Sequence, residues 1–151
     1  MNHLIEEANV NAFNLSLELE RAVIEHRLED DEKIYVTEDG YFPFWIHILK
    51  KQRYIGFATY VMFRESTTAL QRLELANQFN KDTYLSSAHV DKDMLKINHV
   101  LTYRNGILTE TLIRGCRQFS AGIELFITES DPDYQVLMRL SESSSSETNN
   151  E

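Results

Sequence analysis

Two hydrophobic periodicities alternate along the chain. Apolar residues recur at helical spacing in residues 15–28, after Ser66 or Thr67, and again after Thr109. Runs rich in aromatic and β-branched residues, which are typical of strands, lie between them at 33–37, 44–50, 54–64, 84–90 and 95–103. The pattern predicts an α+β fold in the order helix, three strands, helix, two strands, helix. We expect about five strands in one antiparallel sheet, with the helices packed on one of its faces.

Capping residues and turns mark where these elements begin and end. Asn14 or Ser16 suits the start of the first helix, and the acidic residues 29–32 after it indicate a solvated link. Asp39-Gly40 and the polar residues 91–93 suit hairpin turns. Asp131-Pro132-Asp133 predicts a short final helix.

The second and third helices each have a predicted buried side. For the second helix, which we expect to end near Asn80, this side is Leu70, Leu73, Ala76, Asn77 and Phe79. For the third it is Leu112, Ile113, Cys116, Phe119, Ser120, Ile123, Phe126 and Ile127.

Length and charge limit the classes of function. The 151 residues suffice for one core, so we expect a single domain over residues 1–140 and a disordered tail rich in Ser and Glu over 141–151. The formal net charge is -9, and the tail contributes three acidic residues and no basic ones to it. Nucleic acids and anionic membranes are therefore not expected partners. The start lacks the features of a secretory signal and the apolar runs are too short to span a bilayer, which favours a cytoplasmic protein.

The residues that usually carry chemistry are scattered. The five histidines show no spacing typical of a metal site, and His99 is best interpreted as a hydrogen-bonded core residue. Cys116 is the only cysteine and lies in an apolar stripe, where a thiol is usually inert. Gly115 and Gly122 are interpreted as points of close packing. The glycines form no phosphate-binding loop, so we expect no cofactor, no metal and no enzymatic activity.

The hairpin of residues 44–63 is apolar on both sides. One register groups Phe44, Ile46, Ile48, Ile55, Phe57, Val61 and Phe63. The opposite register includes Trp45, Tyr54, Tyr60 and Met62, which we predict to form a protein-binding patch because these residue types are enriched in interfaces. The alternative is that the first or last helix of the same chain covers this second side.

Several short motifs resemble one family. They are residues 75–80 (Leu-Ala-Asn-Gln-Phe-Asn), then Tyr84, Ala88, Val90, Leu95 and Ile97, and then Asn105-Gly106-Ile107 before a long helix. In these residues the chain resembles the YbjN family of bacterial proteins, which are described as sensory transduction regulators and share the fold of type III secretion chaperones. The resemblance spans about residues 15–127. Asn105 departs from it where a second glycine is common, and Asp93-Met94 replaces a looser turn.

The resemblance implies a small non-enzymatic domain that binds other proteins in the bacterial cytoplasm, and a homodimer is one form that it allows. It assigns no catalytic residues, and we interpret Asn77 and Asn80 as residues that end a helix and bond a turn. The first hypothesis is thus a protein-binding or regulatory module, with chaperone-like capture of a client as its most concrete form. An enzyme or small-molecule binder with an unrecognised site, and a structural subunit of an assembly, are the alternatives.

Overall fold

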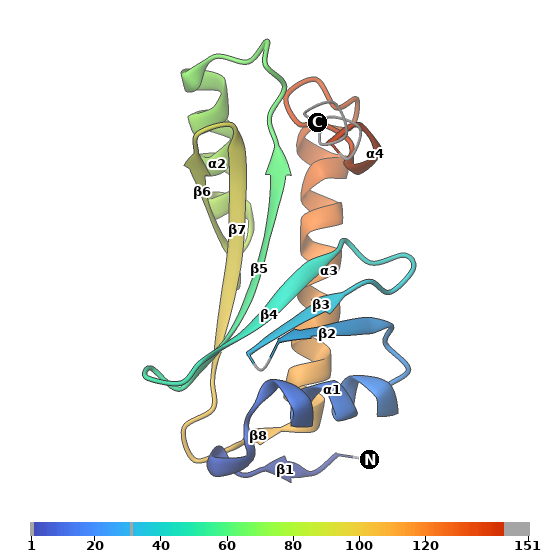
Figure 1. Cartoon of the computed structure of the whole chain (residues 1–151). Helices are drawn as coiled ribbons and strands as arrows, with labels where there is room; N and C mark the ends of the chain where they lie inside the picture. The colour runs from blue at the N-terminus through green and yellow to red at the C-terminus, as the bar shows by residue number, and fades with distance from the viewer. Residues whose placement is uncertain (1, 31, 144–151) are drawn as a thin grey trace. The chain divides into compact units, whose positions relative to one another are not determined.

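A computed structural model of the chain describes residues 2–30 and 32–143 (Figure 1). Its strands are β1 (Leu4–Ile5), β2 (His26–Asp30), β3 (Lys33–Val36), β4 (Phe44–Leu49), β5 (Tyr54–Met62), β6 (Ser87–Asp91), β7 (Met94–Thr102) and β8 (Ile107–Leu108). Its helices are the short 3-10 turn η1 (Glu7–Asn9), α1 (Ala12–Arg21), α2 (Ala69–Asp82), α3 (Thr109–Ser130) and α4 (Leu140–Ser143). The predicted order of helix, three strands, helix, two strands and long helix is present, with β1, β2 and β8 in addition.

The strands form two sheets. Six strands pair in the order β2-β3-β4-β5-β7-β6, and β1 pairs antiparallel with β8. The chain divides into two compact units, which we call unit 1 (1–59 and 98–123) and unit 2 (60–97 and 124–151). β5, β7 and α3 contribute residues to both, so each unit has strands and helix of its own.

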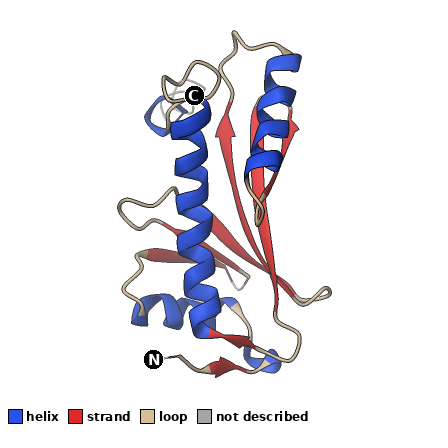
Figure 2. Ribbon diagram, turned by 180° about the vertical axis from the view of Figure 1, so that it is seen from behind, coloured by secondary structure: helices blue, strands red, loops and turns tan. Residues whose placement is uncertain are grey.

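Unit 1 buries one face of its strands against α3. Antiparallel pairing places Val36 beside Phe44, Ile46 beside Phe57 and Ile48 beside Ile55, and each of these six side chains is 3% exposed or less. Phe119 of α3 packs on this face, with its ring centroid 5.3 Å from that of Phe44 and 5.8 Å from that of Phe57. One side of the hairpin that was predicted to be apolar on both sides is therefore a core face. Figure 2, which gives the view from behind, shows α3 lying across these strands.

The first helix is shorter than predicted, and a strand follows it. Asn11 caps α1 by accepting a hydrogen bond from the Asn14 backbone N–H at 2.8 Å. The helix ends because Val23 adopts a left-handed φ of 58°, and the Ile24 N–H then bonds the Leu19 carbonyl. A β-branched residue rarely takes this conformation. Because valine stands here in place of the usual glycine, the sequence gives no sign that the helix ends.

The prediction of helix and acidic link for residues 26–30 is therefore wrong. These residues form the edge strand β2. Their polar sequence hid the strand because both faces of β2 are largely exposed. Charged residues on an edge strand discourage pairing with further chains.

The start of α3 is capped from the N-terminal segment. Asn2 Oδ1 accepts a hydrogen bond from the Glu110 N–H at 3.1 Å, and the Thr109 N–H donates to the His3 carbonyl at 2.9 Å. The β1–β8 pair holds these two segments together. Thr109, predicted to cap this helix, is its first residue, and part of the cap is supplied from more than 100 residues away in sequence.

The predicted inner stripe of α3 is confirmed, although its two glycines differ. All eight stripe residues are buried apart from Ile113, which is partly exposed. A Cβ added at Gly115 would lie 2.9 Å from Phe57 Cε2 and 3.2 Å from Leu101 Cδ1. A Cβ at Gly122 would meet nothing within 4 Å. Close packing therefore explains Gly115, and the same interpretation is wrong for Gly122.

Unit 2 contains α2, whose start and buried side both differ from the prediction. Thr68, rather than Ser66 or Thr67, caps α2 in a reciprocal box with Gln71. Leu70 and Leu73 are 64% and 57% exposed, whereas Leu75, Ala76 and Phe79 are buried. Phe79 packs against Phe126, with ring centroids 4.9 Å apart. The predicted side was wrong at Leu70, Leu73 and Asn77, which are exposed, and it left out the buried Leu75, because the helix buries only its second half.

Two polar residues of unit 2 organise its turns. The Asn80 side chain both donates to the Ala88 carbonyl and accepts from the Ala88 N–H, which ties α2 to β6. This is the predicted structural use of its side chain, although α2 continues past Asn80 to Asp82. Tyr84, predicted to begin a strand, is 98% exposed and precedes β6.

The buried Asp131 carboxylate accepts backbone hydrogen bonds from Gln135, Val136 and Leu137. These bonds fold a turn in place of the predicted short helix at 131–133, which is therefore wrong. The helix near the C-terminus is instead α4.

Of the predicted tail, residues 141–143 belong to α4 and residues 144–151 lie outside the described residues. Over the described part of the chain, no helix combines the length and the apolar character needed to cross a bilayer.

Candidate functional site

The face of the unit 1 strands opposite α3 carries no helix of this unit in either ribbon view (Figures 1 and 2). We call it the open sheet face and define it by Arg27, Tyr35, Trp45, Leu49 and Tyr54. The pleat places these side chains on one side because they alternate with the buried positions of β3, β4 and β5.

Three side chains from neighbouring strands stack across the open sheet face. Arg27 pairs in register with Tyr35, and Tyr35 pairs with Trp45. The Arg27 guanidinium carbon lies 5.4 Å from the Tyr35 ring centroid, and the Tyr35 and Trp45 centroids are 4.6 Å apart. Cation–π and aromatic contacts of this kind stabilise exposed ring faces. The stack is a partly exposed aromatic surface that ends in a guanidinium group.

The far end of the same face is apolar. Leu49 and Tyr54 pair in register and are 41% and 39% exposed. Trp45 stands two side-chain rows away, so the two groups lie about 13 Å apart along the strands. The structure places the predicted residues Trp45 and Tyr54 on one face without direct contact.

His47 lies between these two groups. Partial burial disfavours its charged form, and the nearby Lys33, its register partner, adds repulsion, so the pKa of His47 is lowered from its ordinary value of 6.5. The centre of the face is therefore a neutral imidazole at pH 7, with Lys33 beside it and the carboxylates of Asp30 and Glu29 nearby.

The other two predicted residues belong to unit 2. Tyr60 is 38% exposed and Met62 is partly exposed, both on the side of β5 opposite the buried Val61 and Phe63. The Met62 carbonyl accepts a hydrogen bond from the Met138 backbone N–H at 2.8 Å, so residues 136–138 run beside this part of the strand. The four predicted residues are thus divided between the units.

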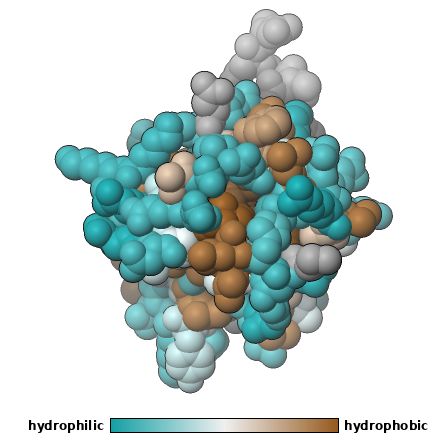
Figure 3. Space-filling view, turned by 90° about the horizontal axis from the view of Figure 1, so that it is seen from below, coloured by the Kyte–Doolittle hydropathy of each residue, from teal (hydrophilic) through white to brown (hydrophobic). Residues whose placement is uncertain are grey.

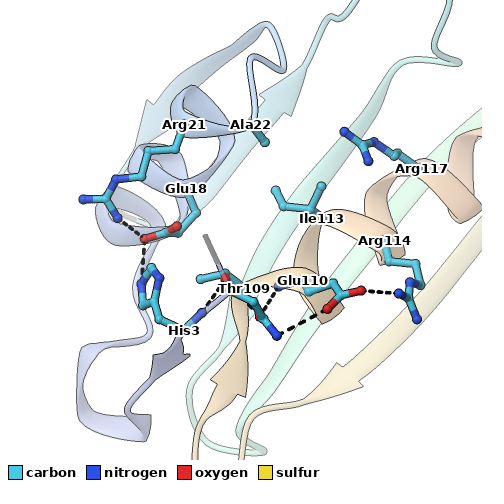
Figure 4. A pocket seen from close by; sticks show the side chains of 10 residues that line it. His3, Glu18, Arg21, Ala22, Thr109, Glu110, Ile113, Arg114 and Arg117 are labelled. Atoms are coloured by element: carbon cyan, nitrogen blue, oxygen red, sulfur yellow. Dashed lines mark hydrogen bonds and ion pairs between the residues drawn. The ribbon is translucent and has the colours of Figure 1, made fainter.

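Unit 1 also contains a cleft of about 590 Å³ between α1 and the first turns of α3 (Figure 4). Its lining comes from three parts of the chain: Asn2 and His3; Glu18, Arg21 and Ala22; and Thr109, Glu110, Ile113, Arg114 and Arg117. Seen from the side of β1, α1 and β8, apolar residues gather in the middle of the surface with polar residues around them (Figure 3).

The charges of the cleft are largely paired. Glu18 is 8% exposed and contacts both Arg21 and His3, the latter at 3.2 Å. Arg114 pairs with Glu110 one helical turn earlier. Arg117 is exposed, and no ion pair to it is found among the described residues. Three arginines against two glutamates leave the cleft with a positive charge in an otherwise acidic chain.

The described residues show no group of three or more His, Cys, Asp or Glu side chains that could hold a metal ion. The thiol of Cys116 is buried, and this burial raises its pKa to about 12. It therefore stays protonated at neutral pH and does not act as a nucleophile.

A family model described as "YbjN: Putative bacterial sensory transduction regulator" matches residues 12–132. The chain belongs to the YbjN family. YbjN from E. coli, described as "a putative transcription regulator", has a crystal structure similar to this one, with a TM-score of 0.67 and 20% sequence identity. The match covers 84% of this chain and 95% of that chain, and it shows a shared fold. No curated protein matches the chain.

Sequence reasoning missed several residues of these sites in this YbjN chain. The sequence could have indicated Tyr35, because the alternation of Ile34 and Val36 already places Tyr35 on the opposite side. It could not have indicated Arg27, because the sequence predicts helix where the strand β2 lies. The cleft joins His3, Glu18 and Arg117, which lie far apart in sequence, and His3 precedes the residues matched by the YbjN model.

Proposed function

We propose that this YbjN-family chain is a non-enzymatic regulatory module of the bacterial cytoplasm that acts by docking a partner protein on the open sheet face. The observation that carries the proposal is the stack of Arg27, Tyr35 and Trp45 on a face that no helix of unit 1 covers. Tyr, Trp and Arg are the side chains most enriched in the energetically important centres of protein interfaces.

Charge indicates the chemistry of the partner. The stack begins with Arg27, which pairs with Glu29, and Lys33 lies next to His47, with Asp30 and Glu29 nearby. The other residues that define the face are aromatic or aliphatic. A segment of another protein with acidic and apolar side chains would pair with both features. Glu29, which contacts Arg27 at 3.0 Å, would be displaced or would share the guanidinium.

Charge also bears on the other partners. The two cations of this face have carboxylates beside them, Glu29 at Arg27 and Asp30 at Lys33, so charge does not disfavour a homodimer, and the crosslinking test below separates the two occupants. The net charge of -9 disfavours nucleic acids and anionic membranes. Chaperone-like capture of a client and assembly into a larger complex are versions of the same docking, distinguished by how long the partner stays bound.

Site-specific photo-crosslinking in the native bacterial cell tests the proposal. Benzoylphenylalanine is placed at Tyr54 on the open sheet face and, as a matched control, at Phe13, which is 61% exposed on α1. We expect an adduct with one other protein from position 54 and none from position 13.

A charge reversal then tests the chemistry of the partner. Arg27→Glu is expected to reduce the adduct from position 54 at least several-fold, whereas Lys81→Glu on α2 leaves it unchanged. An adduct that joins two copies of this chain would mean that the face binds a second copy rather than a different protein. No adduct at position 54, equal yields at both positions, or equal effects of both reversals would overturn the proposal.

A further inference from the structure

The cleft between α1 and α3 has the size of a small-molecule site. Its volume of about 590 Å³ falls within the range of roughly 300–1,000 Å³ typical of ligand pockets. Its residues all belong to unit 1, and the open sheet face includes none of them. The docking function proposed above neither requires nor uses this cleft.

One side of the cleft combines apolar and cationic groups. Ile113 and Arg117 stand one turn apart on α3, so they share a face of the helix. In Figure 4 both side chains extend from α3 toward α1, where Ala22 lies opposite. The apolar side chains of Ile113 and Ala22 thus lie next to the Arg117 guanidinium.

The other charges of the cleft are already engaged. Arg21 binds Glu18, which also contacts His3, and Arg114 binds Glu110. Arg117 is the arginine of this cleft for which the described residues offer no carboxylate partner.

We propose that this cleft binds a small amphipathic anion, whose carboxylate or phosphate head pairs with Arg117 and whose short apolar body packs between Ile113 and Ala22. Guanidinium is suited to such heads because it can donate two parallel hydrogen bonds to two oxygens. The ligand chemistry is therefore a short aliphatic or aromatic acid rather than a bare inorganic ion.

Sodium octanoate is the probe for the test, with 1-octanol as its uncharged counterpart and inorganic phosphate as a head without a body. The full chain, labelled with ¹⁵N, is titrated with each compound and followed by amide NMR. We expect octanoate to shift the amides of Ala22, Ile113 and Arg117 saturably, and octanol and phosphate to bind at least about tenfold more weakly.

Two variants locate the site and one controls for charge. Arg117→Gln removes the head contact on an exposed position and should weaken octanoate binding about tenfold. Ala22→Leu fills the apolar end and should weaken it by a similar factor. Arg104→Gln removes the same charge from an exposed position of unit 1 outside the cleft and should leave binding unchanged.

The proposal is overturned if octanoate produces no saturable shifts at these amides, or if octanol or phosphate binds as tightly as octanoate. It is also overturned if Arg104→Gln weakens binding as much as Arg117→Gln. Partner docking at position 54 is measured in a separate experiment, so the failure of one proposal leaves the other standing.

Discussion

The two faces of the β4–β5 hairpin in unit 1 have similar residue types and opposite fates. Phe44, Ile46 and Phe57 on the inner face are at most 1% exposed, because α3 packs Phe119 against them. Tyr54 and Leu49 on the other face remain about two-fifths exposed, and Trp45 is partly exposed, with its ring centroid 4.6 Å from that of Tyr35. Hydrophobic composition alone therefore does not separate a buried face from an exposed one, whereas the position of α3 does.

The largest difference between the faces is expected for aromatic truncation. Phe57 is fully buried, and its ring lies near those of Phe44, Phe119 and His99. Phe57→Ala should lower the free energy of unfolding by about 3–5 kcal/mol, because it removes buried area and leaves a cavity. Tyr54→Ala should cost about 1 kcal/mol or less. Urea denaturation measures both, and equal costs would mean that the outer face is packed as tightly as the core.

The glycines of α3 sharpen the comparison at the inner face. Gly115→Ala pushes a methyl group to 2.9 Å from the packed ring of Phe57 and should cost about 1–3 kcal/mol in spite of better helix propensity. Gly122→Ala meets no neighbour within 4 Å and should gain roughly 1 kcal/mol. Opposite shifts in Tm are expected, and shifts of the same sign would contradict the described packing.

The open sheet face should show its own dependence on pH through His47. Because the folded-state pKa of His47 is lowered, the unfolded chain binds this proton first as the pH falls. The stabilisation is thus complete above about pH 6.5 and is lost as the pH decreases from there toward the folded-state pKa. The free energy of unfolding, measured by urea denaturation, should fall less between pH 7.5 and pH 5.5 in His47→Gln than in the unchanged chain. An unchanged loss would show that His47 is not desolvated.

The smallest effects on stability are expected for charges introduced at exposed tyrosines. Tyr54→Asp in unit 1 and Tyr60→Asp in unit 2 should each change the free energy of unfolding by about 1 kcal/mol or less, because both side chains are more than one-third exposed. Unfolding of either variant in circular dichroism would show that the chain itself covers that tyrosine. Tyr54→Asp should nevertheless abolish partner capture.

Sequence reasoning succeeded where the periodicity was strong and local. The alternation in β3 to β5 and the long stripe of α3 correctly gave the inner face, and the short motifs around Asn80 indicated the YbjN family. It failed at the end of α1, since Val23 turns the chain without a glycine, and at β2, whose polar residues resemble a link.

The candidate sites were predictable in part. Trp45 and Tyr54 followed from alternation alone. The Arg27 contact required a strand that the sequence concealed, and the cleft required three segments whose proximity depends on the β1–β8 pairing and the cap from Asn2. Long-range contacts of this kind leave no local pattern in the residues.

The central claim is that the open sheet face is accessible in the free chain and covered in the working complex. Trp45 is the only tryptophan of the chain, and its replacement by 5-hydroxytryptophan, which can be excited apart from ordinary tryptophan, keeps the partner's fluorescence out of the acrylamide quenching signal. We predict efficient quenching in the free protein and clear protection, with a blue-shifted emission, once the partner captured through position 54 is added. The same quenching constant with and without that partner would contradict the account.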